Sequence, residues 1–581
     1  MSYAEPKPSV EATFPSHDGA ELHYRHWPAE EPTGRALLLF HRGHEHSGRW
    51  HGTVDALNLT DVDVFAWDAR GHGASPGERG SAEHIGILIC DVDAFVRHIR
   101  DAHGIAVEEM IVVAHSVGAV IVAAWVHDFA PPIRALVLAT PAFKVRLYVP
   151  LAIPMLRLKQ RFLGPSYVKS YVKARMLTHD GEQARRYAQD PEIFREIAVN
   201  LLLDLYDTGA RLVADAGAIR VPLLLLSAGA DWVVDNEVQR QFFERVSSAD
   251  KTWRVLPGFH HAIFHEKDRH LVVDQLREFI TRLFAQPRVE PRSLRDADRG
   301  GYTKTEHFDL LSAPGSLPAK VLRLAFGTVG RLSGGIALGL KRGFDSGETL
   351  DYVYRNRPEG LTALGRLMDR AYLDSPGWSG IRIRRQHLEA MLRGAIEEQH
   401  AAGTPVHILD AACGGGRYVL ETLAALREIP ATALLRDYKP QNIQIAERLR
   451  IELALEGVQI VQGNAFDRAS FTGLEPRPTI GIVSGLLELF PENEAARTCL
   501  GGFADAIEPG GLLLYTGQPW HPQLRFIAGV LGNREGEPWV MRRRTQEEMD
   551  ELVREAGFEK EAQAVDPWGI FTVSRARRVA R

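Results

Sequence analysis

The 581-residue sequence predicts two consecutive α/β domains, and three observations lead to this prediction. Short apolar segments alternate with helical segments in both halves of the chain, which is typical of sheets covered by helices. Ser116 lies between an apolar segment and a helical one. Residues 410–417 place a glycine-rich loop in the same kind of position much later in the chain. Because a single α/β domain often reaches about 250 residues, two large domains fit this length.

The composition is that of an ordinary globular protein, with 45% hydrophobic residues, 25% charged residues and a net charge of −5. Such a weak charge predicts no nucleic-acid partner. Cys90, Cys413 and Cys499 lack metal or disulfide spacing, so we expect no metal site and a reducing, cytoplasmic location. No apolar run has the length of a membrane helix, and the N-terminus lacks the apolar core of a signal peptide.

The first predicted domain spans residues 1–285. Residues 10–27 alternate as two short strands around a turn. Compact apolar runs follow, and each predicts a strand buried on both faces; they are residues 36–40, 62–67, 111–114, 135–139 and 222–227. The long helical insertion before the last of these strands, at about 141–215, is where a cap over an active site is expected.

The predicted cap is strongly basic. Residues 144–175 contain eight Lys or Arg and no Asp or Glu, together with the apolar run 147–156. This pattern is equally typical of peripheral contact with the anionic inner face of the membrane and of a solvated helix face. We expect the substrate to be a small molecule or a lipid.

A nucleophilic serine between strand and helix needs small neighbours, as in the pattern G-x-S-x-G. Ala114-His-Ser116-Val-Gly118 fits this pattern, with alanine at the first glycine. An acid and a histidine should follow in that order, and Asp231 and His261 do so. His261 would take the serine proton, while Asp231 would orient the imidazole.

Two other histidines, His260 and His265, are alternatives for the base. An oxyanion needs two backbone N–H donors. Val117, directly after the serine, and Gly43, in the loop after the third strand, are the candidates.

Residues 10–285 resemble the monoglyceride lipase and lysophospholipase branch of the α/β hydrolases. The matching stretches are 45–49, 68–77, the Ser116 turn, Asp231 and His261. The resemblance implies an α/β-hydrolase fold with a helical cap and a serine hydrolase of lipid-like carboxylic esters, of monoacylglycerol or lysophospholipid type. The family usually has His-Gly in the oxyanion loop, whereas this chain has His41-Arg42, and His44 replaces another small residue. We expect these long side chains to narrow the mouth of the site or to meet an anionic group.

Residues 286–316 are rich in Pro, Gly and charge, which predicts a linker. Helical material then runs over 317–403, and a second strand-helix series occupies 404–581. In this series, Asp410 ends a strand, the glycine loop follows, and Asp437 ends the next strand. A helix N-terminus favours an anion, and an acid at the second strand end can accept ribose hydroxyls. NAD would favour G-x-G-x-x-G, whereas this loop reads G-G-G-R.

The D-x-x-C-G-x-G form of the loop resembles motif I of class I methyltransferases that use S-adenosyl-L-methionine. Ala412 stands where that motif often has glycine. The whole of 315–581 resembles a bacterial methyltransferase family often fused to α/β hydrolases, through residues 343–354, 517–523 and 539–544. The resemblance implies a Rossmann-like domain, methyl transfer, and cofactor contacts from Asp410, Gly414, Gly416, Asp437, Tyr438, Asn464 and Ala465. Asp410 and Asp437 could instead only cap helices.

Glu488 and His521 follow the fourth and fifth strands of this domain, where an acceptor would bind. His521 is either a general base or a structural residue next to Trp520. The two motif sets together predict a bifunctional enzyme, a serine hydrolase fused to a methyltransferase. One alternative is a lipase or esterase with a non-catalytic, cofactor-binding regulatory domain. Another is a pair of non-enzymatic interaction modules.

Overall fold

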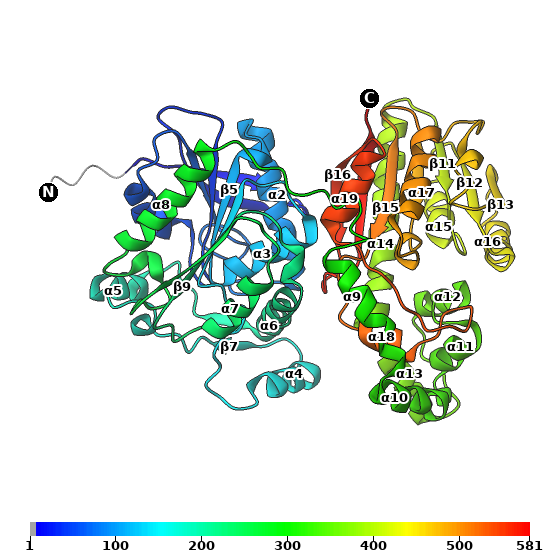
Figure 1. Cartoon of the computed structure of the whole chain (residues 1–581), viewed down its shortest axis with the longest axis horizontal. Helices are drawn as coiled ribbons and strands as arrows, with labels where there is room; N and C mark the ends of the chain where they lie inside the picture. The colour runs from blue at the N-terminus through cyan, green and yellow to red at the C-terminus, as the bar shows by residue number, and fades with distance from the viewer. Residues whose placement is uncertain (1–6, 581) are drawn as a thin grey trace. The chain divides into compact units, whose positions relative to one another are not determined.

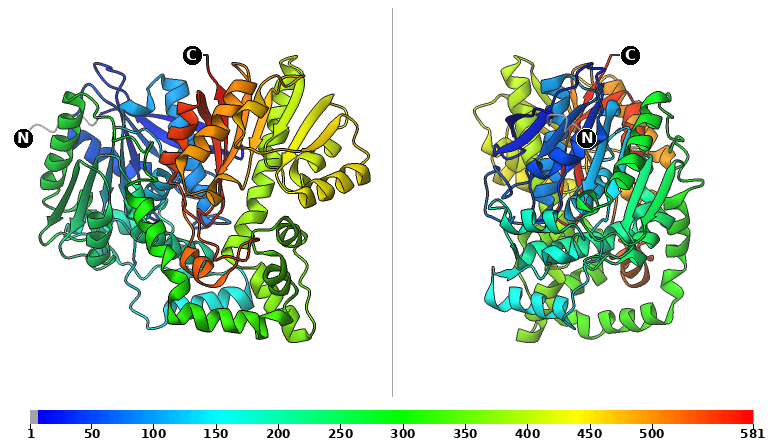
Figure 2. Two further views of the ribbon diagram at one scale, coloured as in Figure 1. Left: turned by 45° about the vertical axis from the view of Figure 1, so that its right-hand side comes forward. Right: turned by 90° about the vertical axis from the view of Figure 1, so that its left-hand side faces the viewer.

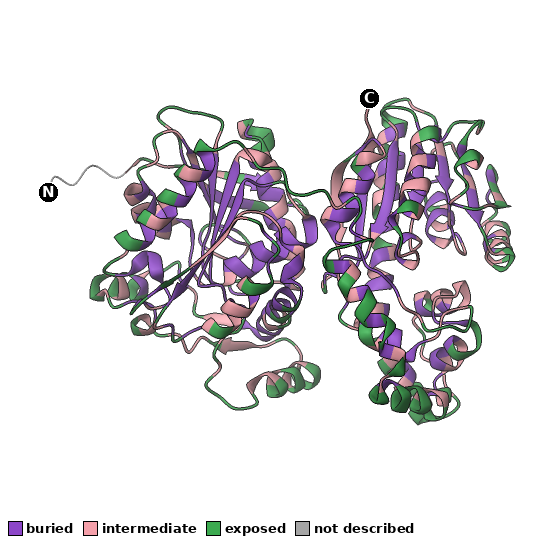
Figure 3. Ribbon diagram, viewed as in Figure 1, coloured by how far each residue is buried: buried purple, intermediate pink, exposed green. Residues whose placement is uncertain are grey.

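The computed structural model describes residues 7–580 and divides into two compact units between Arg292 and Ser293 (Figure 1). In each unit a buried sheet lies inside a layer of helices whose outer faces are exposed (Figure 3). No helix in the described part of the chain is both long and apolar enough to cross a membrane.

The N-terminal unit is built on an eight-stranded sheet in the order β1-β2-β4-β3-β5-β6-β9-β10. β2 is antiparallel to both of its neighbours, and all other pairs are parallel. Every residue of the central strands is buried, as their unbroken apolar sequences predict. This is the predicted α/β-hydrolase fold. The strands are β1 Val10–Pro15, β2 Glu21–Trp27, β3 Ala36–Phe40, β4 Asp63–Trp67, β5 Met110–His115, β6 Ala135–Ala139, β9 Leu223–Ala228 and β10 Lys251–Leu256.

Helices cover both faces of this sheet. The first and last helices, α1 and α8, share one core with the sheet, whereas α2, α3, α6 and α7 contact one another in a chain. Figure 2 shows the layers of each unit from two further sides. These helices are α1 His51–Leu57, α2 Ile85–His103, α3 Val117–Phe129, α6 Val199–Ala214, α7 Asn236–Arg245 and α8 His270–Ala285.

The segment between β6 and β9 lies where the sequence predicts a cap. It contains mostly short elements, and its most exposed helix is α4 (Figure 3). Before α6, its elements are α4 Ala152–Leu163, β7 Tyr167–Lys169, η3 Ala174–Met176, α5 Gly181–Gln189 and β8 Glu196–Ala198.

The C-terminal unit has a seven-stranded sheet in the order β13-β12-β11-β14-β15-β17-β16. The first five strands are parallel, and β17 runs antiparallel to both of its neighbours. The strand order reverses between β11 and β14, as in Rossmann-like folds, so a crevice is expected at the carboxyl ends of these strands. The strands are β11 Val406–Asp410, β12 Ala431–Asp437, β13 Val458–Gln462, β14 Ile480–Val483, β15 Leu512–Gly517, β16 Phe558–Val565 and β17 Thr572–Arg578.

A group of helices precedes this sheet and shares a core with a later insertion, residues 518–545. The sequence predicts helices over 317–403 but not this partnership. The helices of this unit are α9 Tyr302–Leu311, α10 Leu317–Gly327, α11 Gly334–Arg342, α12 Gly347–Arg355, α13 Ala363–Leu373, α14 Pro376–Ala401, α15 Arg417–Ala425, α16 Pro440–Glu452, α17 Asn493–Ala506, α18 Leu524–Val530 and α19 Gln546–Glu555.

The prediction that residues 286–316 form a linker is wrong for much of this segment, because α9 lies within it and belongs to the C-terminal unit. Thr303, His307 and Leu310 are buried and share one face of α9, at the i, i+4, i+7 spacing. The Arg542 guanidinium donates to the Thr303 hydroxyl at 2.9 Å. The Gly- and Pro-rich flanks concealed this short helix.

Candidate active sites

Ser116 lies on a sharp turn between β5 and α3, with φ 57° and ψ −112°. A non-glycine residue in this region is strained, and the surrounding structure must hold it there. The Ser116 N–H donates to the Ala139 carbonyl at 2.9 Å, and the Ser116 carbonyl accepts the Ala142 N–H at 3.1 Å. Gly118 is required by close packing, since a Cβ there would lie 2.3 Å from the His41 carbonyl oxygen.

The folded chain brings Ser116, His261 and Asp231 together as the sequence predicts. The Ser116 Oγ lies 2.7 Å from His261 Nε2, and His261 Nδ1 lies 2.9 Å from Asp231 Oδ2. The other oxygen of Asp231 accepts the N–H groups of Val233 and Val234. Burial raises the pKa of Asp231, but His261 and these N–H groups outweigh burial and hold the pKa below its ordinary value. Asp231 is therefore charged at neutral pH and can stabilise an imidazolium.

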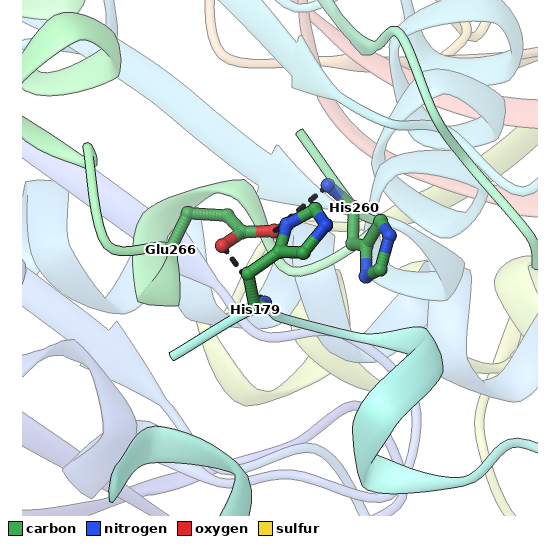
Figure 4. Close-up of side chains that lie close together, drawn as sticks. All are labelled: His179, His260 and Glu266. Carbon is green, nitrogen blue, oxygen red and sulfur yellow. Dashed lines mark hydrogen bonds and ion pairs between the residues drawn. The ribbon is translucent and has the colours of Figure 1, made fainter. Parts of the chain in front are cut away.

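The two alternative histidines face elsewhere. His265 Nε2 lies 3.1 Å from the Arg49 carbonyl, and burial lowers the pKa of His265 to about 4. The His260 ring lies tilted against the His179 ring, with 3.7 Å between centroids (Figure 4). Neither ring contacts Ser116, so only His261 has the geometry of the base.

Glu266 organises the backbone next to His261. Its buried carboxylate accepts the His260 N–H at 2.8 Å and the His179 N–H at 3.0 Å (Figure 4). It also accepts the Thr178 hydroxyl at 3.2 Å. His179, His260 and Glu266 are close enough together to resemble a metal site. Both oxygens of Glu266 already accept hydrogen bonds, however, which favours a structural role. The carboxylate ties the predicted cap to the loop that carries His261.

Gly43 and Val117 are adjacent at the mouth of the Ser116 turn, since a Cβ on Gly43 would lie 2.9 Å from Val117 Cγ2. Neither backbone N–H donates to another residue in the described part of the chain. Two free N–H groups beside a serine hydroxyl are what an oxyanion requires.

Arg42 and His44 are already engaged within the protein. Arg42 is buried, donates to Glu45 at 2.9 Å and lies over the Tyr187 ring at 4.8 Å. Burial lowers the pKa of His44 to about 4, so this ring is neutral at pH 7. Both side chains line the cavity beside Ser116, as expected if they narrow its mouth. The Arg42 charge is offset by Glu45, which argues against the expected role of Arg42 in meeting an anionic group. No sequence pattern pointed to Glu45 or Tyr187 as the partners.

Ser116 and His261 open into a cavity of about 530 Å³. Its walls are mainly apolar side chains from α2, α3, α4 and α6, including Ile85, Leu88, Ile121, Leu156, Leu201 and Leu205. Because the lining has few polar groups, the cavity fits a long apolar portion of a substrate.

In the C-terminal unit, the glycine loop is tied to the second strand. The Gly414 N–H donates to Asp437 Oδ2 at 2.9 Å, and Asp437 Oδ1 accepts from Lys439 N–H and from the Asn442 side chain. Gly414 and Gly416 have φ values of 55° and 64°, which favour glycine. A Cβ at Gly414 would point into open space, so its absence leaves room for a ligand beside the loop.

This loop borders a cavity of about 380 Å³ at the point where the strand order reverses. Six of the seven predicted cofactor residues line it: Gly414, Gly416, Asp437, Tyr438, Asn464 and Ala465. A glycine loop, a carboxylate at the second strand end and a small residue after the third form a suitable set for S-adenosyl-L-methionine.

Asp410 differs from the prediction, because it is fully buried and does not line the cavity. Its oxygens accept the Tyr418 hydroxyl at 2.6 Å and the Ala412 N–H at 3.1 Å. Burial raises the pKa of Asp410 to about 7. Asp410 therefore supports the glycine loop from below instead of touching a ligand.

Glu488 and His521 line a second cavity, of about 410 Å³, next to the first. Glu488 pairs with Arg384 of α14 at 3.1 Å, and Arg544 holds the adjoining Leu487 carbonyl at 2.7 Å. Burial lowers the pKa of His521 to about 4, and its Nδ1 accepts the Gln523 N–H at 3.0 Å. This hydrogen bond occupies the ring nitrogen that a base would use and agrees with the structural alternative. The sequence analysis did not identify Arg384, because 104 residues separate it from Glu488 and no motif marks its helix.

Comparison with known proteins agrees with the fold predicted for each half of the chain. A family model described as "Putative methyltransferase" matches residues 276–578, just over half of the chain, and one described as "Serine aminopeptidase, S33" matches 31–268. "Uncharacterized protein YnbC" of Escherichia coli K12 is 48% identical over 97% of this chain and 98% of its own length. "Monoacylglycerol lipase" of Mycolicibacterium smegmatis is 28% identical over 46% of this chain and 96% of its own length.

A solved monoacylglycerol lipase of Paleococcus ferrophilus has a TM-score of 0.42 and 24% identity, and the match covers 45% of this chain and 99% of that one. The family match and the full-length relative establish the affiliation of the chain. The chain belongs to the family whose model is described as "Putative methyltransferase", and it carries a lipase-like serine hydrolase domain at its N-terminus.

Proposed function

We propose that the chain is a bifunctional enzyme, in which a serine hydrolase of lipid-like carboxylic esters is joined to an S-adenosyl-L-methionine-dependent methyltransferase. The hydrolase assignment rests on the hydrogen bonds that join Ser116, His261 and Asp231 next to an apolar cavity. The methyltransferase assignment rests on the crevice where the strand order reverses, which the glycine loop and Asp437 line.

In the hydrolase, His261 takes the Ser116 proton as the hydroxyl attacks the ester carbonyl. The N–H groups of Gly43 and Val117 stabilise the oxyanion, and Asp231 stabilises the cationic ring. His261 then returns the proton to the leaving alcohol, which leaves the acyl group on Ser116. Water, deprotonated by His261, attacks this acyl ester, and the acid leaves as the Ser116 hydroxyl takes its proton back. The apolar cavity binds the acyl chain, which favours monoacylglycerol or lysophospholipid esters.

In the methyltransferase, Gly414 and Gly416 let the backbone approach the cofactor. When the cofactor is bound, Asp437 would hold its ribose hydroxyls, and Tyr438, Asn464 and Ala465 would border its base. The bound cofactor supplies an electrophilic methyl group. The protein aligns the acceptor with it and excludes water.

The exposed helix α4 is proposed to bring the hydrolase to its substrate at the inner membrane face. Leu151, Leu158, Phe162 and Leu163 are exposed there, beside Arg161. Exposed apolar and basic side chains on one helix favour an anionic lipid surface.

Two variants test the two halves. Ser116→Ala is expected to lower ester hydrolysis by at least about 10⁴-fold, without changing cofactor binding. Asp437→Ala is expected to weaken saturable binding of S-adenosyl-L-methionine, without changing hydrolysis. Hydrolysis that survives Ser116→Ala would contradict the first assignment. Cofactor binding without transfer to any component of a lipid extract would favour the regulatory alternative.

A further inference from the structure

The second cavity of the C-terminal unit adjoins the crevice assigned above to the cofactor. Asp345, Leu350, Arg384, Gly485 and Leu489 line both, so a molecule in the second cavity reaches the first. The inference drawn from it rests on the proposed methyltransferase function, because the second cavity is where an acceptor would bind.

The walls of this cavity are largely apolar and come from the helices before the sheet and from the insertion 518–545. They include Ile336, Trp378, Ile381, Phe526, Ile527 and Leu531. Burying an apolar body here removes apolar surface from water, which favours binding. The cavity therefore selects an acceptor with a large apolar part.

Unused hydrogen-bond donors lie among these apolar walls. Arg384 is only 6% exposed; it donates to Glu488 and stacks over Phe571, and its other N–H groups donate to no residue in the described part of the chain. The side-chain N–H groups of Gln518 and Trp539 also lack a partner, but these atoms are too deeply buried to meet a molecule in the cavity. Buried donors are normally satisfied, so the free N–H groups of Arg384 point to an oxygen-rich group of the ligand. A guanidinium with free N–H groups fits a planar oxyanion such as a carboxylate.

Apart from Arg384, each titratable group that lines this cavity has a hydrogen-bond partner or keeps its proton. Glu488 pairs with Arg384, and Asp345 accepts the Arg534 N–H at 2.6 Å. His521 is neutral, with its Nδ1 occupied. Tyr372 keeps its proton, because burial raises its pKa. A hydroxyl or amine acceptor would need one of these groups to remove a proton, whereas a carboxylate needs none.

We infer that the methyl acceptor is an apolar carboxylic acid, which Arg384 holds by its carboxylate at the junction of the two cavities. A carboxylate oxygen attacks the methyl carbon, the new C–O bond forms as the S–CH₃ bond breaks, and no proton is taken up or released. The products are a methyl ester and S-adenosylhomocysteine. Hydrolysis of a lipid ester by the N-terminal domain releases an acid of this class, so that reaction can supply the acceptor.

The test uses the full chain with Ser116→Ala, so that an ester product is not hydrolysed. Binding of labelled decanoate is measured by equilibrium dialysis and analysed as two sites, because the apolar cavity beside Ser116 also holds acyl chains. Methyl transfer from labelled S-adenosyl-L-methionine to decanoate or palmitate is measured by mass spectrometry of the methyl ester. Arg384→Met is expected to weaken decanoate binding at one of the two sites about 10- to 100-fold, as for loss of charged hydrogen bonds, and to leave the other site unchanged. Arg393→Met is the control, because Arg393 is exposed on the same helix and lines neither cavity.

Because Arg384→Met leaves Glu488 buried without its partner, the double variant Arg384→Met/Glu488→Leu removes both charges and is expected to lose acid binding to the same extent. Glu488→Gln is expected to bind decanoate more tightly and to retain transfer. A loss of transfer of about 10²-fold or more in Glu488→Gln would identify Glu488 as a general base and overturn the inference.

A separate measurement of cofactor binding distinguishes failure of the carboxylate inference from failure of the proposed methyltransferase function. Saturable cofactor binding, combined with decanoate binding that is independent of Arg384 or with no methyl ester from any acid, overturns the carboxylate inference alone. If the cofactor does not bind, the methyltransferase function fails, and the inference fails with it.

Discussion

The Glu266 carboxylate accepts the His260 N–H at 2.8 Å, one residue before the imidazole that contacts Ser116. The same carboxylate accepts the His179 N–H from the segment that precedes α5. A single buried acid therefore connects the predicted cap to the loop of the candidate base. This relationship makes Glu266 a positioning residue for His261.

Glu266→Ala is expected to lower kcat for ester hydrolysis by up to about 100-fold with a smaller change in KM, because the His261 loop loses its anchor. Glu266→Gln keeps one acceptor oxygen and should recover part of the loss. Steady-state kinetics on a short-chain ester check this. A wild-type kcat in Glu266→Ala would show that the hydrogen bonds to Glu266 do not position His261.

Gly118→Ala is expected to reduce hydrolysis strongly, because its Cβ would lie 2.3 Å from the His41 carbonyl and displace the loop that carries Gly43. Overpacking of this kind typically costs about 1–3 kcal/mol of stability. Gly181→Ala is the control, since a Cβ at Gly181, the first residue of α5, would have no other atom within 4 Å. Wild-type activity and melting temperature in Gly118→Ala would contradict the packing argument.

The buried carboxyl of Asp410 makes the stability of the C-terminal unit depend on pH. Its pKa is raised to about 7 by burial, against an ordinary value of about 4. Between these values the folded state keeps a proton that the unfolded chain has lost, so stability falls as pH rises through this range and levels off above about 7. The full effect is up to about 4 kcal/mol.

Hydrogen exchange of peptides covering residues 404–426, corrected for the intrinsic rate, reports this stability at pH 5, 6, 7 and 8. Wild-type protection should decline with rising pH, while Asp410→Asn should vary much less. Parallel profiles for the two proteins would rule out Asp410 as the source.

The apolar face of α4 is expected to bind anionic vesicles. Phe162→Ser/Leu163→Ser removes two exposed apolar side chains and should weaken binding to phosphatidylglycerol vesicles at least about tenfold. Val289→Ser is the matched control, because Val289 is exposed in the same unit outside the cap. Sedimentation with vesicles measures the effect. Equal binding of all three proteins would leave α4 as a solvated helix face.

Local patterns were sufficient for the strands and for the residues at their ends. Uninterrupted apolar runs predict β3, β5, β6 and β9, because strands buried on both faces need apolar side chains throughout. Ser116 and Asp437 were identifiable because strand-to-helix turns impose local requirements on small residues and acids. Helix α9 was missed, since its three buried residues are surrounded by residues typical of a linker.

By itself, the sequence determined two successive α/β units, the order of serine, acid and histidine, and the glycine loop, because each of these depends on residues close together in the chain or on a fixed chain order. Only the tertiary structure decided between His260, His261 and His265, moved Asp410 beneath the loop, and brought Arg384 to Glu488. These outcomes depend on packing between distant segments, where burial and the supply of hydrogen-bond partners determine what each side chain can do.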